Sequence, residues 1–130
     1  MRSIPLLLSL IFAMLLLSAC ADESNPTDAI ESYLKAQVAG NADDLVKLSC
    51  AAWEAEAKTA AASFQSVDAK IDDLICKENG SDGDYKLITC EGTIVIQYRG
   101  EDPRSQNVPD LTYRVIKENN EWKMCGTQTP

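Results

Sequence analysis

Cysteine is the residue type in this sequence that allows the widest range of chemistry. The chain has 130 residues and contains five cysteines, at positions 20, 50, 76, 90 and 125. A thiol can carry an acyl group, form a disulfide, ligate a metal ion or act as a nucleophile. Histidine is absent, which excludes Ser-His-Asp triads, Cys-His dyads and every histidine-ligated metal site. The spacing of the cysteines therefore decides which of these chemistries the chain can support.

The residues before Cys20 have the composition of an export signal. Arg2 provides a positive charge, and the apolar run from Leu6 to Leu17 is interrupted only by Ser9. This run is shorter than the roughly 20 apolar residues that cross a bilayer, so we do not expect a permanent transmembrane helix.

The four residues Leu17-Ser18-Ala19-Cys20 resemble the lipobox of bacterial lipoproteins. This resemblance implies that a signal peptide of residues 1–19 is removed and that the Cys20 thiol is acylated at the new N-terminus. Two or three acyl chains hold a protein at a membrane much more firmly than one. Residues 20–25 would then be a short tether, and the protein would be exported and lipid-anchored, facing the periplasm or the cell exterior. The alternative is an ordinary signal peptide with an unmodified Cys20.

The chain after residue 19 is strongly acidic. Removing residues 1–19 takes away Arg2 and no acidic residue, so 12 − 1 = 11 basic side chains face 20 acidic ones, a net charge of −9 over 111 residues. That length corresponds to one domain. Because nucleic acids and anionic lipid surfaces attract basic proteins, we expect no nucleic-acid partner. The membrane is expected to be a partner through the lipid on Cys20.

The first half of the chain has helical periodicity. Asn25 is a suitable N-cap before Pro26, and apolar residues then recur at helical spacing as far as Gly40. A second short helix is expected after Asn41 or Asp43, and a third over the alanine-rich residues 51–64.

The second half has the alternation of strands. A strand is expected over residues 67–71, continuing through 74–76 past a bulge at 72–73, and a turn follows at 78–84. Strands at 85–89 and 93–98 come next, with a bulge at Gly92 between them. An irregular loop at 99–110 then leads to a hairpin of 111–117 and 121–125 around Asn119-Asn120. In this register Val115 opposes Met124 and Lys117 opposes Trp122. Helices followed by antiparallel strands predict an α+β fold, with the N-terminal helices packed on a curved antiparallel sheet.

The four cysteines after Cys20 form an even set, which in an exported domain indicates two disulfides. A zinc site is disfavoured because no two of them have C-x2-4-C spacing. Cys76 and Cys90 lie on either side of the expected turn, so we expect them to be cross-strand neighbours. Cys50 would then pair with Cys125, and a Cys90–Cys125 bridge is the competing arrangement.

Two segments resemble the NTF2-like superfamily as it occurs in small bacterial lipoproteins. They are P-T-D-A-I-E-S-Y-L-K-A-Q-V-A-G-N-A-D-D-L, which starts at Pro26, and Y-R-V-I-K-E-N-N-E-W-K-M-C-G, which ends at Gly126. The resemblance implies a cone, in which a curved sheet wraps a long helix and leaves an apolar pocket at its open end. The domain would span residues 26–126, followed by a tail of residues 127–130. The candidate pocket residues are Tyr33, Trp53, Tyr113 and Trp122.

We expect a non-catalytic envelope lipoprotein domain that binds a protein or a small apolar ligand or serves a structural role. We expect no catalytic residue, cofactor or metal, and the oligomeric state stays open. The alternative is an NTF2-like enzyme or carrier that uses the pocket. Such an enzyme needs a carboxylate in the pocket, facing a donor such as Tyr33 or Tyr113. A pocket filled by Trp53, Phe64 and Trp122 would exclude both catalysis and carriage.

Overall fold

The computed structural model of the chain describes residues 24–130. The predicted signal peptide, Cys20 and most of the predicted tether lie outside the described residues. Among the residues that are described, no helix is long and apolar enough to cross a membrane.

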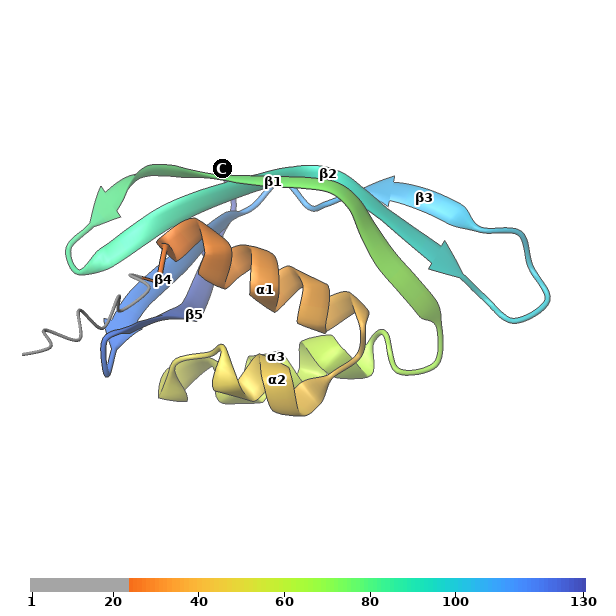
Figure 1. Cartoon of the computed structure of the whole chain (residues 1–130), viewed down its shortest axis with the longest axis horizontal. Coiled ribbons are helices and arrows are strands. Elements are labelled where there is room, and N and C mark those ends of the chain that lie inside the picture. Colours follow the sequence, from red (N-terminus) through yellow and green to blue (C-terminus); the bar gives the residue numbers. More distant parts are fainter. Residues whose placement is uncertain (1–23) are drawn as a thin grey trace, which may run out of the picture.

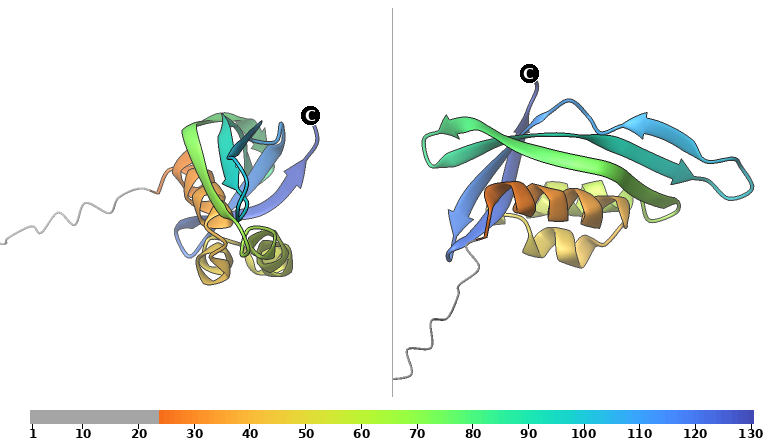
Figure 2. Two further views of the ribbon diagram at one scale, coloured as in Figure 1. Left: turned by 90° about the vertical axis from the view of Figure 1, so that its right-hand side faces the viewer. Right: turned by 45° about the horizontal axis from the view of Figure 1, so that its top comes forward.

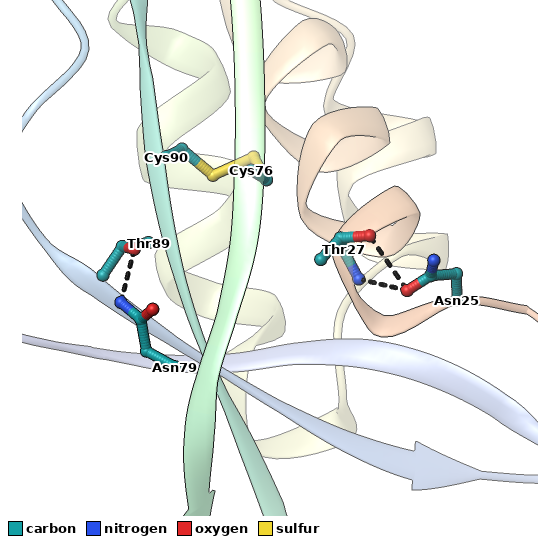
Figure 3. Close-up of a disulfide and its surroundings, with 6 residues drawn as sticks. All are labelled: Asn25, Thr27, Cys76, Asn79, Thr89 and Cys90. Atoms are coloured by element: carbon teal, nitrogen blue, oxygen red, sulfur yellow. Dashed lines mark hydrogen bonds between the residues drawn. A yellow bond between two sulfur atoms is a disulfide. The ribbon is translucent and has the colours of Figure 1, made fainter.

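The first helix, α1 (Pro26–Val38), begins where the sequence predicts it. The side chain of Asn25 accepts a hydrogen bond from the backbone amide of Thr27 at 3.0 Å, as Figure 3 shows, so it satisfies one of the free amides of the first turn. The apolar residues at helical spacing are all buried: Ile30, Tyr33, Leu34 and Val38. The chain then reverses at Gly40, which has a φ of +65°, a conformation that favours glycine.

The next helices form a second layer. The short helix α2 (Ala42–Lys47) is capped by the side chain of Asn41, which accepts from the amide of Asp44. The third predicted helix is shorter than expected, because its first turn is the 3-10 helix η1 (Ala51–Trp53) and only α3 (Glu54–Ala62) is α-helical. Figure 2 shows α2 and α3 side by side, and Figure 1 shows α1 between them and the sheet.

Five antiparallel strands form one curved sheet, whose concave face covers α1 (Figures 1 and 2). The strands are β1 (Asp68–Asp82), β2 (Tyr85–Gln97), β3 (Arg104–Asn107), β4 (Thr112–Glu118) and β5 (Glu121–Gln128). The sheet order is β1-β2-β4-β5, and β3 pairs with β2. The prediction of an α+β fold with N-terminal helices on a curved antiparallel sheet is therefore confirmed.

The predicted turn at 78–84 is wrong, because β1 continues to Asp82 and only Gly83 and Asp84 separate it from β2. Residues 77–82 of β1 are all exposed and form an edge of the sheet beside β2, which pairs with β4 on its other side. An ion pair joins Glu78 to Lys86 at 3.3 Å, and the Asn79 side chain donates to the Thr89 hydroxyl at 2.6 Å (Figure 3). The polar composition of this part of β1 therefore reflects its exposed position at the edge of the sheet.

The predicted bulge at 72–73 is present, and Asp73 has a φ of +53°. Gly92 was also expected to be a bulge, but β2 is continuous and Gly92 lies opposite the bulge of β1. A Cβ atom on Gly92 would lie 3.2 Å from the Cα atom of Leu74 and 3.3 Å from the carbonyl oxygen of Asp72. The bulged backbone of β1 therefore leaves little room for a side chain at position 92.

The predicted irregular loop at 99–110 contains a strand. β3 pairs with residues 93–96 of β2, although all four β3 residues are exposed. Alternation of apolar and polar residues signals a strand only when one face is buried, so the sequence carries no signal for β3.

The closing hairpin has the predicted register. Val115 pairs with Met124 and Lys117 pairs with Trp122, around Asn119 and Asn120 with φ values of 50° and 64°. These are the positive φ values of a tight hairpin turn. The last strand ends at Gln128, two residues beyond the domain end expected at Gly126.

Candidate functional site

An apolar cavity of about 180 Å³ lies between the helices and the concave face of the sheet. Residues from α1, η1, α3 and all five strands or their flanking loops line it. They are Tyr33, Leu34, Gln37, Val38, Trp53, Ala60, Phe64, Ile71, Ile94, Gln106, Pro109, Leu111, Tyr113, Met124 and Thr127. Gln106 and Thr127 are exposed, so the cavity opens on their side. Most of the other wall residues are apolar and at least partly buried.

Three of the four predicted pocket residues meet at this cavity. Tyr33 lies on the buried stripe of α1, Trp53 ends the 3-10 turn, and Tyr113 points inward from β4. The indole Nε1 of Trp53 donates a hydrogen bond to the Tyr33 hydroxyl at 3.1 Å. This bond fixes the positions of both rings, although the two residues belong to different layers.

Trp122, the fourth predicted pocket residue, does not line the cavity. It lies on the same side of β5 as Met124 but two residues nearer the hairpin turn, a displacement of about 7 Å along a strand. There it lines a surface groove beside Asn25 and Asp28, at the start of α1. The Lys117 ammonium lies 5.7 Å from its ring centroid. The prediction failed because alternation identifies the face of a strand and not the position along it.

Trp53 and Phe64 form part of the cavity wall and do not fill the space. The wall residues Ile94, Leu111 and Met124 were not among the pocket residues predicted from the sequence. Alternation marks Ile94 and Met124 as inward-facing, and both are at most 5% exposed. No signal in the sequence says which of the inward-facing residues adjoin a space.

Both tyrosines of the wall are buried, with 3% of each side chain exposed. Burial raises the pKa of Tyr33, and the hydrogen bond from Trp53 partly offsets this effect. Burial also raises the pKa of Tyr113 to about 12, and the neighbouring Tyr33 contributes in the same direction. Both phenols are therefore protonated at neutral pH and can donate a hydrogen bond into the cavity.

No Asp, Glu, Lys or Arg is among the residues that line the cavity within the described part of the chain. A general acid or base of the carboxylate type is therefore missing from this wall, and so is a counter-ion for a charged ligand. The same described residues contain no group of three or more Asp, Glu or Cys side chains that could hold a metal ion.

Four cysteines form two disulfides in the pairing that the sequence analysis favoured. Cys76 and Cys90 face each other across β1 and β2 (Figure 3). Cys50 bonds to Cys125 on β5, and the competing Cys90–Cys125 bridge is absent. The Cys50 amide also donates to the carbonyl oxygen of Met124 at 2.8 Å. The segment between α2 and η1 is thus attached to the strand that carries the cavity residue Met124.

No protein-family model matches the chain, and no curated protein matches it. Among solved structures, the chain is similar to the solution structure of a SEC-C motif containing protein from Rhodopseudomonas palustris. The two are 14% identical, the match covers 78% of this chain and 76% of that one, and the TM-score is 0.49. We therefore infer function from the residues of this chain alone.

Proposed function

We propose that this protein is an exported bacterial lipoprotein, anchored through Cys20, whose NTF2-like domain binds a small apolar molecule without catalysing a reaction on it. The lipobox-like residues Leu17–Cys20 support the anchor. Two disulfides support export, because such bonds persist in oxidising compartments. A helix held in the concave face of a curved sheet supports the NTF2-like assignment.

The observation that carries the binding function is the apolar cavity of about 180 Å³. Native interiors are close-packed and contain few voids larger than a water molecule. A space of this size lined by aromatic and aliphatic side chains therefore has a cost in packing, which a ligand would recover. The carboxylate that an enzyme would need is not in the described wall, so we do not propose catalysis.

The cavity can be tested with ring-sized apolar probes. Benzene or toluene should bind the full-length, disulfide-bonded chain and raise its melting temperature, because a ligand that binds only the native state stabilises it. Ala60 lines the cavity and Ala62 is exposed on the same helix. Ala60→Leu should occupy part of the space and weaken binding, whereas Ala62→Leu should not. Equal binding by both variants would contradict the assignment.

The anchor can be tested by mass spectrometry of the protein extracted from bacterial membranes. We expect a chain that begins at Cys20 and carries two or three acyl chains, and a Cys20→Ala variant that leaves the membrane fraction. A mature chain that begins at an unmodified Ala21 would refute the anchor. It would leave the binding function of the domain untouched, since the cavity lies wholly within residues 24–130.

A further inference from the structure

Tyr113 is a buried residue whose hydroxyl makes no hydrogen bond within the described residues. The Tyr113 side chain is 97% buried, since 3% of its surface is exposed. Within residues 24–130, no group donates to or accepts from its hydroxyl, whereas the Tyr33 hydroxyl accepts from Trp53. Buried tyrosine hydroxyls usually have a partner, because the desolvation of an unpaired polar group is unfavourable.

Tyr113 lines the cavity, and the accessibility of its hydroxyl indicates that this group faces the space. In the described part of the chain, the only side-chain polar atom that is both completely enclosed and unpartnered is Nε of Arg114. The Tyr113 hydroxyl therefore has open space beside it, and the cavity is the space that Tyr113 lines. A molecule in the cavity can accept the hydrogen bond that the protein leaves unmade.

The cavity volume limits the size of that molecule. A cavity of about 150 Å³ lined by apolar side chains holds benzene. The cavity here measures about 180 Å³, and the difference is close to the ~30 Å³ that one water molecule occupies in the liquid. A six-membered ring with one small polar substituent fits this space.

The absence of charged side chains from the described wall limits the charge of the ligand. A carboxylate, phosphate or ammonium group would be buried without a counter-ion, which is strongly unfavourable. A neutral oxygen acceptor loses much less on burial, and a hydrogen bond from a phenol compensates for it.

We propose that the cavity binds a neutral, ring-sized molecule with one oxygen acceptor, such as a ketone, and that the Tyr113 hydroxyl donates a hydrogen bond to that oxygen. The Trp53–Tyr33 pair forms the wall beside the ring. This inference rests on the proposed function, because it requires the cavity to accept a ligand.

Two probes of nearly the same shape test the hydrogen bond. Cyclohexanone has the acceptor oxygen, and methylenecyclohexane has a methylene group in its place. Both are titrated into the full-length, disulfide-bonded chain and followed by ligand-observed NMR. The variant Tyr113→Phe removes the hydroxyl and keeps the ring. The matched control is Tyr98→Phe, since Tyr98 is 42% exposed and does not line the cavity.

We expect Tyr113→Phe to weaken cyclohexanone binding by about tenfold, the effect of one net hydrogen bond, and to change methylenecyclohexane binding by less than about twofold. Tyr98→Phe should change neither. Equal changes for the two probes would overturn the inference, as would unchanged cyclohexanone binding. In both cases the cavity would still bind ligands, so the proposed function would stand. Failure of both probes to bind the unmodified chain would refute the proposed function and this inference together.

A measurement on the unmodified chain avoids any effect of the substitution on folding. The carbonyl carbon of ¹³C-labelled cyclohexanone shifts downfield when its oxygen accepts a hydrogen bond. We expect the bound resonance to lie downfield of its position in cyclohexane. A bound resonance at the hydrocarbon position would overturn the inference. Equal binding of the two probes by the unmodified chain, with an ordered water molecule on the Tyr113 hydroxyl, would also overturn the inference.

Discussion

The two disulfides close loops of very different length, and this difference predicts how much each contributes to stability. The Cys50–Cys125 bond joins residues 75 positions apart, whereas Cys76–Cys90 spans 14 positions. On the chain-entropy scale, the long loop corresponds to about 4.5 kcal/mol of stabilisation and the short loop to about 3 kcal/mol. The bond from the helical layer to β5 should therefore exceed the bond within the hairpin by about 1.5 kcal/mol.

The test compares two double variants, Cys50→Ala with Cys125→Ala and Cys76→Ala with Cys90→Ala. Urea unfolding should show losses in the free energy of unfolding of about 4.5 and about 3 kcal/mol respectively. Packing acts in the same direction, because Cys50 is 1% exposed and its replacement leaves a small void, whereas Cys90 is 7% exposed and Cys76 is only partly buried. The urea dependence should also steepen in both variants, because the unfolded chain becomes more extended.

The unmodified chain after reduction is the control, since it lacks both bonds and keeps all the cysteine side chains. Reduction should lower its free energy of unfolding by more than either double substitution does. An equal loss for the two variants, or a larger loss for the hairpin pair, would refute the reasoning. The local β1–β2 pairing would then be the main source of stability, in place of the attachment of the helices to β5.

Three further predictions concern packing and pH. Gly92→Ala should lower the free energy of unfolding by about 1–3 kcal/mol in urea titrations, because the new Cβ atom would lie 3.2 Å from the Cα atom of Leu74. Met124 is 1% exposed, so Met124→Ala should lower the free energy of unfolding by about 2–5 kcal/mol. Ile75 is 58% exposed, so Ile75→Ala should change it by less than about 0.5 kcal/mol. Similar losses of stability in the two variants would contradict the described core. Burial raises the pKa of Tyr113 to about 12, so between about pH 10 and pH 12 the tyrosine ionises in the unfolded chain but not in the folded one. Its contribution to the free energy of unfolding is therefore complete below about pH 10 and falls by about 2–3 kcal/mol as the pH rises towards 12. Tyr113→Phe should remove that part of the alkaline loss, measured from unfolding curves at each pH.

The local elements were predictable where the residues that decide them are neighbours in the sequence. Asn25 and Pro26 define the start of α1, and Asn119-Asn120 defines the turn between β4 and β5. Each depends on the intrinsic conformational preference of one or two residues. The Cys76–Cys90 bridge was expected from the same local reasoning, whereas Cys50 and Cys125 are 75 positions apart and their bridge was the favoured of two arrangements.

The errors lie where a strand has no buried face. The end of β1 beyond Glu78 and the whole of β3 are exposed, so neither shows the alternation by which strands are recognised. Both segments are held by backbone hydrogen bonds to β2, and a polar sequence gives no sign of such pairing. Gly92 shows a related limit: the sequence marks an unusual position, and only the opposite strand shows that a close backbone approach is the reason.

The sequence by itself determined the α+β class, the start of α1 and the closing hairpin, because each follows from preferences and periods that act over a few residues. For the disulfides it favoured the observed pairing, and the structure decided against the competing Cys90–Cys125 bridge. The tertiary structure alone decided that a cavity exists and which residues line it. Tyr33, Trp53 and Tyr113 come from three separate elements, and the space between them depends on how closely α1 and the second helical layer approach a curved sheet. That distance results from packing across the whole domain, so no local pattern contains it. The same packing brings Met124 to the cavity and leaves Trp122, two residues away on the same strand, outside it.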